Sequence, residues 1–371
     1  MTTVAAVDCG TNSIRLLISS VLAQDDDEVQ LLDVERRMEI VRLGQGVDRT
    51  GEFAPEALER TFEALRGFAE LMREHGVDLG PDTVRMVATS ATRDAANRQV
   101  FIDGVREILG VEPEVISGDE EAELSFIGAT AELESDGDGE AGAADPSASR
   151  GADLTDSRSA DLPDSHGVIA PDPDGDGPAF PLPFLVVDIG GGSTEFVLGY
   201  ADDDGEGVVR AARSVDIGCV RMSERHFTAD PPTAEQVAAA IADVDAALDE
   251  AAAVVPLEEA ATVVCVAGTA TTVAGIAADL REYDPEILHH MRVSAERTHT
   301  IAEELLAMDR DRRAALGVMH PGRVDVIAAG ALILDRVVAR IGAKEFVASE
   351  HDILDGIAWS LSLGEPPEEQ G

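Results

Sequence analysis

The chain has 371 residues, of which 44% are hydrophobic, so it has room for two domains with substantial cores. Its 28 basic and 73 acidic residues give a formal net charge of −45, and Lys344 is the only lysine. This charge disfavours a broad basic face for nucleic acid. An acid excess with almost no lysine resembles the proteins of salt-accumulating halophiles, and an acidic partner-binding protein is the alternative.

The start of the chain and its cysteines indicate where the protein works. The first residues lack the basic start and apolar stretch of a signal peptide, and no run has the length of a membrane helix. Cys9, Cys219 and Cys265 are widely spaced, which fits neither a disulfide framework nor a zinc site. A cytoplasmic protein that does not act at a membrane is expected.

Residues 1–131 are expected to form a first domain. Apolar, β-prone runs predict strands at 3–8, 13–20, 29–42, 83–88 and 112–116. Apolar residues at helical spacing predict helices at 55–74, 97–109 and 118–130.

Residues 132–182 have a different composition. Asp, Gly, Ser, Ala and Pro dominate this stretch, and no aromatic residue occurs before Phe180. Such a segment cannot bury enough apolar surface to offset the entropy of ordering it. We expect an acidic, disordered insertion.

Residues 183–350 are expected to form a second domain, followed by a helix and tail over 351–371 that packs back on the first domain. Strands are predicted at 184–188, 194–200, 207–215, 262–266 and 345–348. Helices are predicted at 219–228, 233–253, 270–280, 296–307, 323–341 and 351–363.

A glycine-containing turn between two strands occurs once in each domain. Asp8 enters the first turn and Asp188 enters the second, which has three consecutive glycines. Glycine lets the backbone approach an anion closely, and turn N–H groups with Ser and Thr hydroxyls bind phosphate oxygens. Two such turns, a domain length apart, indicate two related domains that hold phosphate between them.

Several other residues are candidates, each with a structural alternative. Arg15 is a phosphate ligand or a surface residue. Asp188 and Glu195 flank the second turn and suit Mg²⁺, which prefers oxygen ligands, although Asp188 could instead satisfy loop N–H groups. Gly268 lies where a strand ends and a helix begins. This helix N-terminus could bind an anion, or the small residue could serve only to allow close packing. Arg93 follows a strand in a Ser/Thr-rich loop, and a surface ion pair is its alternative.

Together these motifs resemble the exopolyphosphatase/guanosine pentaphosphate phosphohydrolase family of the actin–Hsp70–sugar kinase superfamily. The resemblance implies an α/β fold with two ribonuclease-H-like domains flanking a cleft. The matching stretches keep the family's order and span most of the chain outside the insertion; they are 8–13, 88–93, 116–122, 188–195, 217–221, 268–272 and 320–325.

The resemblance also assigns roles to residues. It implies that Glu121 is the catalytic base, although an acid in a first helical turn is usually a cap or a dipole complement. It implies a divalent cation, Mg²⁺ or another, with Asp8, Asp188 and Glu195 as candidate ligands. The candidate phosphate ligands, from the resemblance or from their own sequence positions, are Gly10, Thr11, Asn12, Ser13, Arg15, Arg93, Gly190, Gly191, Gly192, Ser193, Thr194, Gly268 and Thr269.

The implied reaction is metal-assisted hydrolysis of the terminal phosphoanhydride of polyphosphate, which releases orthophosphate. Guanosine pentaphosphate, cut at its 5′-γ-phosphate, is the alternative substrate. A non-catalytic phosphate or alarmone sensor is an alternative of another class, and an actin-like filament or sugar kinase is a weaker one. The C-terminal helical domains of longer family members are expected to be absent, which puts processivity on long chains in doubt. A homodimer is compatible with this interpretation.

Overall fold

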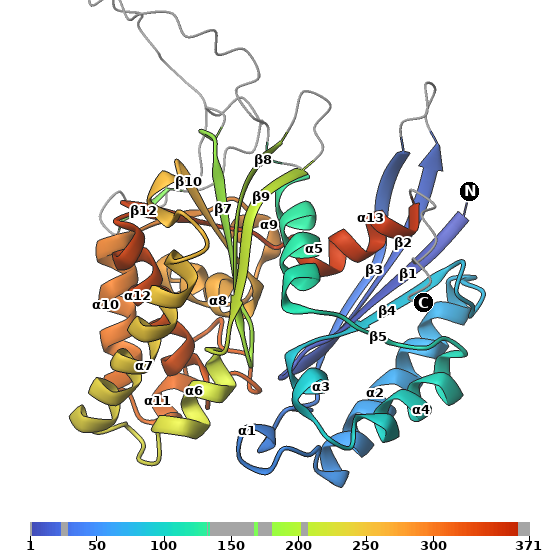
Figure 1. Ribbon diagram of the computed structural model, residues 1–371, viewed down its shortest axis with the longest axis horizontal. Coiled ribbons are helices and arrows are strands. Elements are labelled where there is room, and N and C mark those ends of the chain that lie inside the picture. The colour runs from blue at the N-terminus through green and yellow to red at the C-terminus, as the bar shows by residue number, and fades with distance from the viewer. Residues whose placement is uncertain are drawn as a thin grey trace, which may run out of the picture.

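The computed structural model describes residues 2–23, 29–131, 133, 167–169, 180–201 and 207–362. These residues form two α/β domains, each built around one sheet, with two helices lying between the sheets (Figure 1). Within this described part, no helix combines the length and the apolar character needed to cross a bilayer.

The first domain contains a five-stranded sheet with the order β3-β2-β1-β4-β5. β1, β2 and β3 are antiparallel, whereas β4 and β5 run parallel to β1. One face is covered by α2 and α4, whose Leu65 and Phe101 are fully buried. The elements are β1 (Thr2–Cys9), β2 (Ser13–Ala23), β3 (Val29–Ile40), α1 (Val47–Thr50), α2 (Pro55–Glu74), β4 (Val84–Ala88), α3 (Ser90–Asp94), α4 (Arg98–Leu109) and β5 (Glu114–Val115).

The second domain contains a seven-stranded sheet with the order β6-β11-β12-β10-β7-β8-β9. Its part β9-β8-β7-β10-β12 repeats the order and the strand directions of the first sheet. The two domains therefore share one topology, with β11 and β6 added at an edge. The strands are β6 (Val168–Ile169), β7 (Phe184–Ile189), β8 (Thr194–Ala201), β9 (Gly207–Val215), β10 (Thr262–Val266), β11 (Arg292–Ser294) and β12 (Glu345–Ala348).

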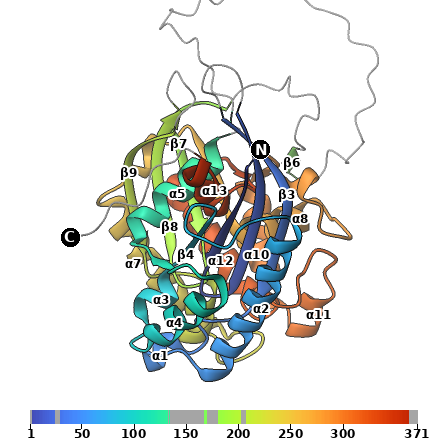
Figure 2. The same cartoon turned by 90° about the vertical axis from the view of Figure 1, so that its right-hand side faces the viewer.

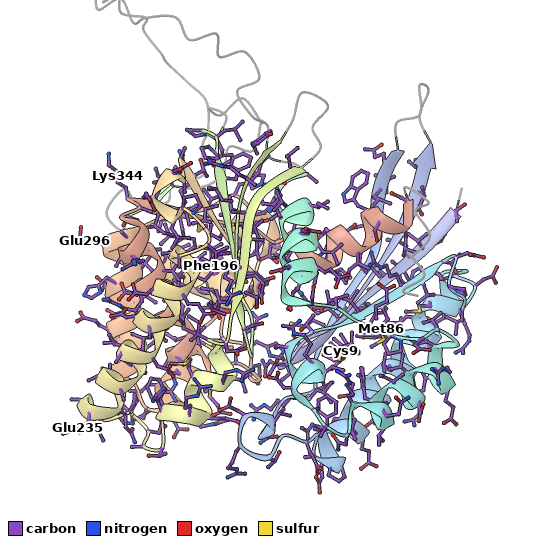
Figure 3. The ribbon with its side chains drawn as sticks, in the orientation of Figure 1. Cys9, Met86, Phe196, Glu235, Glu296 and Lys344 are labelled. Carbon is purple, nitrogen blue, oxygen red and sulfur yellow. The ribbon has the colours of Figure 1, made fainter. Side chains whose placement is uncertain are left out.

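Helices cover the outer side of the second sheet, as Figure 3 shows. Phe196 is fully buried between sheet and helices, whereas Glu235, Glu296 and Lys344 lie on the outside. The helices are α6 (Cys219–His226), α7 (Ala234–Ala252), α8 (Ala267–Ala277), α9 (Pro285–Leu288), α10 (Ala295–Ala307), α11 (Arg310–Ala314) and α12 (Ile327–Ile341), with a 3-10 turn at Leu257–Glu259.

The structure differs from the sequence prediction at short elements. The stretch expected to be disordered contains β6, which pairs with β11 through Val168 and Val293. Disorder is therefore wrong for these residues: Val168 packs against the core of the second domain, and the Gly167 carbonyl accepts the Ser294 N–H. Most of 132–182 lies outside the described residues. β11, α9 and α11 were not predicted, because three to five residues are too few to show a hydrophobic period.

Two helices cross between the sheets, α5 (Gly118–Thr130) and α13 (Ile353–Ser362) (Figures 1 and 2). α13 buries Leu354 and Ile357 against Ala6 and Leu17 of the first sheet. α5 packs its Phe126 against the second sheet. The chain thus ends its described course on the first domain.

The close crossing of α5 and α13 depends on two glycines, one in each helix, that lie against the backbone of the opposite segment. A Cβ on Gly128 would lie 1.9 Å from the Asp352 carbonyl oxygen, and one on Gly356 would lie 2.1 Å from that of Leu124. Neither backbone can move aside without separating the helices, so side chains are excluded at both positions.

Gly128→Ala should therefore lower the free energy of unfolding by about 1–3 kcal/mol, the usual cost of overpacking. Gly67→Ala is the matched control, because Gly67 is exposed in α2 and an added Cβ would contact nothing. It should stabilise the protein by roughly 0.5–1 kcal/mol. Urea unfolding of both variants checks the pair, and equal stabilities would contradict the close crossing.

Candidate active site

The two glycine turns have the same backbone hydrogen bond and meet at one cavity between the domains. In each turn a glycine N–H donates to a serine carbonyl at 3.0 Å, from Gly10 to Ser13 and from Gly190 to Ser193. Asp8 pairs with Arg15 across the first hairpin, and Asp188 pairs with Glu195 at the equivalent place in the second. The repeated motif in the sequence thus corresponds to a repeated structure.

The second turn touches the first domain, which explains two of its glycines. A Cβ on Gly191 would lie 2.9 Å from Thr11 Cβ, and one on Gly192 would lie 2.5 Å from Ser90 Oγ. Thr11 and Ser90 are themselves linked by a hydrogen bond of 2.9 Å between their hydroxyls. The sequence suggested close approach to a polyanion, but at Gly192 the close neighbour is the other domain.

The start of α5 separates the roles of two adjacent glutamates. Glu120 completes a capping box with Ser117: its Oε2 accepts the Ser117 N–H at 2.8 Å, and its own N–H donates to Ser117 Oγ at 3.2 Å. Glu121 instead faces the cavity and is 8% exposed. Burial raises the pKa of the Glu121 carboxyl, although the ion pair with Arg93 acts in the opposite direction.

Arg93 holds Glu121 and does not line the cavity. Its Nη1 donates to Glu121 Oε2 at 2.8 Å and to the Ile116 carbonyl at 3.0 Å. The sequence predicted Arg93 as a phosphate ligand, but in the structure its guanidinium is already paired with the Glu121 carboxylate.

Two buried carboxylates of the second hairpin are held by serines. Ser125 Oγ donates to Asp188 Oδ2 at 2.9 Å, and Ser214 Oγ donates to Glu195 Oε1 at 2.7 Å. Burial raises the pKa of Asp188 to about 7, and the negative charges of Asp352 and Glu121 add to the shift. Burial, together with Glu121 and Asp188, also raises the pKa of Glu195.

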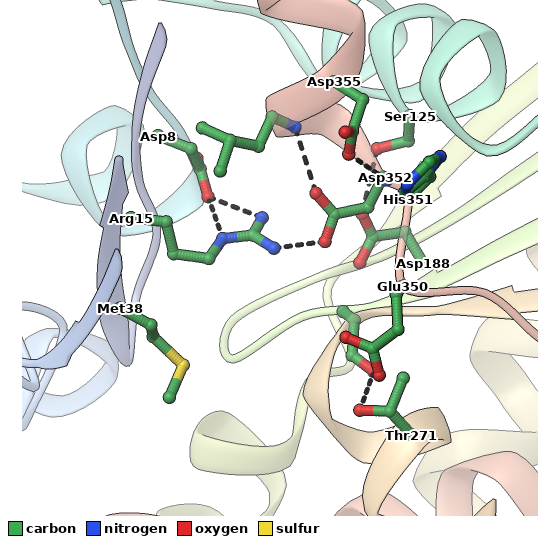
Figure 4. Close-up of polar contacts among 12 residues, drawn as sticks. Asp8, Arg15, Met38, Ser125, Asp188, Thr271, Glu350, His351, Asp352 and Asp355 are labelled. Carbon is green, nitrogen blue, oxygen red and sulfur yellow. Dashed lines mark hydrogen bonds and ion pairs between the residues drawn. The ribbon is translucent and has the colours of Figure 1, made fainter. Parts of the chain in front are cut away.

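Asp8 and Arg15 line another wall of the cavity and form an ion-pair chain with Asp352 (Figure 4). Arg15 donates from Nε and Nη2 to Asp8 Oδ2 at 3.0 and 2.7 Å, and from Nη1 to Asp352 Oδ2. Burial raises the pKa of the Asp8 carboxyl in spite of Arg15. The other oxygen, Asp8 Oδ1, is buried without a hydrogen-bond partner.

The N-terminus of α8 completes the cavity together with Arg323, which follows α11. Arg323 lies against Gly268 and donates from Nη1 to Thr272 Oγ1 at 3.1 Å. No carboxylate lies within ion-pair distance of its guanidinium among the described residues. The sequence places Arg323 in the motif at 320–325, but only the fold brings it to the cavity.

One cavity brings most of the predicted residues together. Four do not line it: Arg93, Gly192, Thr194, whose hydroxyl donates to the Ile217 carbonyl at 2.6 Å, and Glu195. The candidates that line it are Asp8, Gly10, Thr11, Asn12, Ser13, Arg15, Glu121, Asp188, Gly190, Gly191, Ser193, Gly268 and Thr269. The lining residues that were not predicted as ligands include Met38, Thr89, Ser90, Cys219 and Arg323.

The charges of the cavity favour a bound cation. Its described lining carries three carboxylates, Asp8, Glu121 and Asp188, against two arginines, Arg15 and Arg323. Asp8 Oδ1 and Asn12 Oδ1 are buried acceptors without partners. Across the described residues, no three His, Cys, Asp or Glu side chains are arranged as a ready metal cage. These donors suit Mg²⁺, which takes one or two carboxylates and completes its shell with substrate phosphates and water.

Two sheets of one topology with a cavity between them define the actin–Hsp70–sugar kinase-like fold that the family resemblance implied. A model of the Ppx/GppA phosphatase family matches residues 21–139 and 181–363. The chain therefore belongs to the Ppx/GppA phosphatase family.

Three similar proteins refine this assignment. Exopolyphosphatase 2 of Mycobacterium tuberculosis (strain ATCC 25618 / H37Rv) is 44% identical over 374 residues, which cover 98% of this chain and 99% of that protein. A guanosine-5′-triphosphate,3′-diphosphate pyrophosphatase of Vibrio atlanticus is 31% identical over 224 residues, 60% of this chain and 33% of that protein. The solved structure of an exopolyphosphatase-like protein has a TM-score of 0.80 and 40% identity, with 98% and 99% of the two chains covered.

Proposed function

We propose that the protein is an exopolyphosphatase, which hydrolyses the terminal phosphoanhydride of polyphosphate and releases orthophosphate. The observation that carries this proposal is a single cavity where both glycine turns meet a buried glutamate, Glu121. The 44% identity to Exopolyphosphatase 2 along the whole chain supports polyphosphate as the substrate.

Phosphate oxygens are bound by groups from both domains. The turns after Asp8 and Asp188 supply backbone N–H groups and the hydroxyls of Thr11 and Ser193, and the start of α8 supplies its N-terminal N–H groups. Arg323 supplies positive charge, because no carboxylate neutralises it in the described structure. Gly192 and Thr194 serve the packing of the turn instead.

Glu121 acts as the general base. Its carboxylate removes a proton from the attacking water, the water oxygen bonds to the terminal phosphorus, and the bridging P–O bond breaks with the electron pair going to the shortened chain. Arg93 is a positioning residue, because its ion pair fixes the Glu121 carboxylate. Burial without this ion pair would favour the protonated, inactive acid.

Asp8 and Asp188, whose carboxylates line the cavity, would hold a divalent cation, Mg²⁺ or another. Such a cation would supply positive charge against the polyanion and against the charge that develops in the transition state. Glu195 does not line the cavity, so it would influence a bound cation through its neighbour Asp188.

Guanosine pentaphosphate is the second candidate substrate, supported by the partial match to the Vibrio protein. Orthophosphate release from polyphosphate, guanosine pentaphosphate and ATP, measured side by side with Mg²⁺ at molar KCl, separates the candidates. We expect the highest kcat/KM for polyphosphate. A higher value for guanosine pentaphosphate would reverse the order, and no release from any of them would favour a sensor.

The composition supports a cytoplasmic, salt-adapted protein. At molar salt the Debye length is about 3 Å, against about 10 Å at 0.1 M. Screening relieves the repulsion within a chain of net charge −45 and its repulsion of an anionic substrate. Screening also weakens the interdomain ion pairs of Arg221 with Asp48 and Asp94. Relief of repulsion outweighs this loss, because the chain has 73 acidic residues and only 28 basic ones.

Melting temperature and kcat/KM should therefore rise together from 0.1 M towards molar KCl. Measuring both across this range checks the expectation, with sucrose of equal osmolarity as the control for effects other than screening. A flat or falling melting temperature would contradict salt adaptation and leave the phosphatase proposal intact.

A further inference from the structure

Asp352 lies outside every motif that pointed to the site, yet it belongs to the same buried network. It precedes α13 and is 3% exposed. In Figure 4 its carboxylate faces Arg15, the cavity residue that also holds Asp8. The residue comes from the C-terminal end of the described chain, 337 positions from Arg15.

The backbone locks the Asp352 carboxylate in place. Its Oδ1 accepts the N–H of Leu354 at 3.0 Å, which leaves Oδ2 for Arg15. Its own N–H donates to Asp355 Oδ2 at 2.8 Å. Burial acts to raise the pKa of Asp352, but Arg15, the Leu354 N–H and Arg36 outweigh it and lower the pKa, so the group is ionised.

Arg15 transmits this fixed position to Asp8. A guanidinium is planar with donors in a rigid fork, so contacts to two carboxylates define its plane. Nε and Nη2 both donate to Asp8 Oδ2, and this orients the Asp8 carboxylate with Oδ1 unpartnered. Without Asp352, Asp8 would be the one carboxylate partner left to the guanidinium among the residues that the structure describes, and the guanidinium could turn about the bonds of its long side chain.

We propose that Asp352 is a positioning residue for the reaction: through Arg15 it fixes the oxygen that Asp8 presents to the cavity. The inference rests on the proposed function, since it assigns Asp8 a place at the reacting phosphate. It links α13, which packs on the first domain, to the geometry of the cleft. Asp352 touches neither substrate nor metal in this account.

The chain offers a matched control three residues further on. Asp355 lies in the first turn of α13, pairs with Arg36 and accepts the Asp352 N–H. Arg36 does not line the cavity. Asp355→Asn keeps an amide oxygen that can accept the Asp352 N–H. It removes one carboxylate and the ion pair with Arg36, and no partner of Arg15.

Steady-state kinetics with polyphosphate and melting temperatures test the proposal on the full chain. Asp352→Asn should lower kcat roughly 10- to 100-fold, the effect of a misplaced reacting group. Its KM should stay unchanged or fall, because one negative charge near a polyanion is lost. Asp355→Asn should also lower the melting temperature, because it loses the ion pair with Arg36, but kcat should stay within about twofold of wild type. Arg15→Met and the double variant Arg15→Met/Asp352→Asn should have equal kcat, since Asp352 acts only through Arg15.

Three outcomes would overturn the proposal: wild-type kcat in Asp352→Asn, an equal loss in Asp355→Asn, or additive losses in the double variant. If Asp352→Asn does not fold, Arg15→Lys replaces it. Lysine keeps the charge but cannot bridge two carboxylates, so kcat should fall with KM unchanged, and full kcat would overturn the proposal. Failure of the proposed function is a separate result, because the wild-type enzyme would then release no orthophosphate from polyphosphate.

Discussion

Replacing Glu121 with glutamine should lower kcat by about 10²–10⁴-fold, the range for loss of a general base. Glutamine has the same shape and can still accept the Arg93 N–H through its amide oxygen, so the cavity keeps its form. It cannot take a proton from water. KM for polyphosphate should remain near the wild-type value, because Glu121 binds no phosphate in this account.

Glu120→Gln is the matched control for this prediction. The two glutamates are adjacent on α5, but Glu120 Oε2 caps the helix and lies away from the cavity. A glutamine can complete the same capping box. We expect kcat within about twofold of wild type. Near-wild-type turnover of Glu121→Gln, or equal losses in both variants, would show that Glu121 is not the base.

Asp188→Asn should abolish most activity and yet stabilise the protein. Burial and the neighbouring charges of Asp352 and Glu121 raise the pKa of Asp188 to about 7, so its ionised form is unfavourable in the folded state. Asparagine removes this charge and keeps an oxygen that accepts the Ser125 hydroxyl hydrogen bond. At pH 8 the gain in the free energy of unfolding should approach 4 kcal/mol at most, from about 1.4 kcal/mol per pKa unit.

The stabilisation should depend on pH in one direction. Between the ordinary Asp pKa near 4 and about 7, folded wild-type protein keeps the Asp188 proton that the unfolded chain releases. Wild-type stability from this group is therefore present at low pH and is lost as the pH rises through that window. The difference in melting temperature between Asp188→Asn and wild type should be small at pH 4.5 and large at pH 8.

Asp82→Asn is the control for the pH series, because Asp82 is exposed and far from the cavity. Its melting temperature should follow that of the wild type at every pH. If Asp188→Asn is destabilised at pH 8, the buried charge of Asp188 does not strain the folded state. Saturating Mg²⁺ should raise the wild-type melting temperature more than that of the variant, because the cation relieves the same repulsion.

The sequence predicted features that depend on local pattern. The two hairpins are examples, because an Asp-to-glycine turn between two apolar strands is visible within about fifteen residues. The long helices over Pro55–Glu74 and Ala234–Ala252 are others, since their apolar period extends over several turns. The resemblance to a known family then supplied the superfamily fold, which strand order in the structure confirms.

Contacts between distant segments could not be predicted in the same way. Arg93 carries no local sign that its partner is Glu121, and Arg15 none that its partner is Asp352. Arg323 was predicted as the first residue of a helix over 323–341, but α12 begins only at Ile327, so Arg323 lies before the helix and at the cavity. β6 was missed because it consists of one valine and one isoleucine, Val168 and Ile169, in an acidic stretch. These two residues form a strand through their pairing with β11, which the local sequence does not show.

Isotope transfer from water tests the central claim most directly, that water attacks the terminal phosphorus in this cavity. Polyphosphate is hydrolysed to a few per cent in ¹⁸O-labelled water with Mg²⁺ at molar KCl, and the label in each product is measured by mass spectrometry. We expect one ¹⁸O atom in each orthophosphate released and none in the shortened chain. Label in the shortened chain, with unlabelled orthophosphate, would mean attack on the penultimate phosphorus. Label in neither product would mean that water is not the nucleophile. Either result would contradict the mechanism.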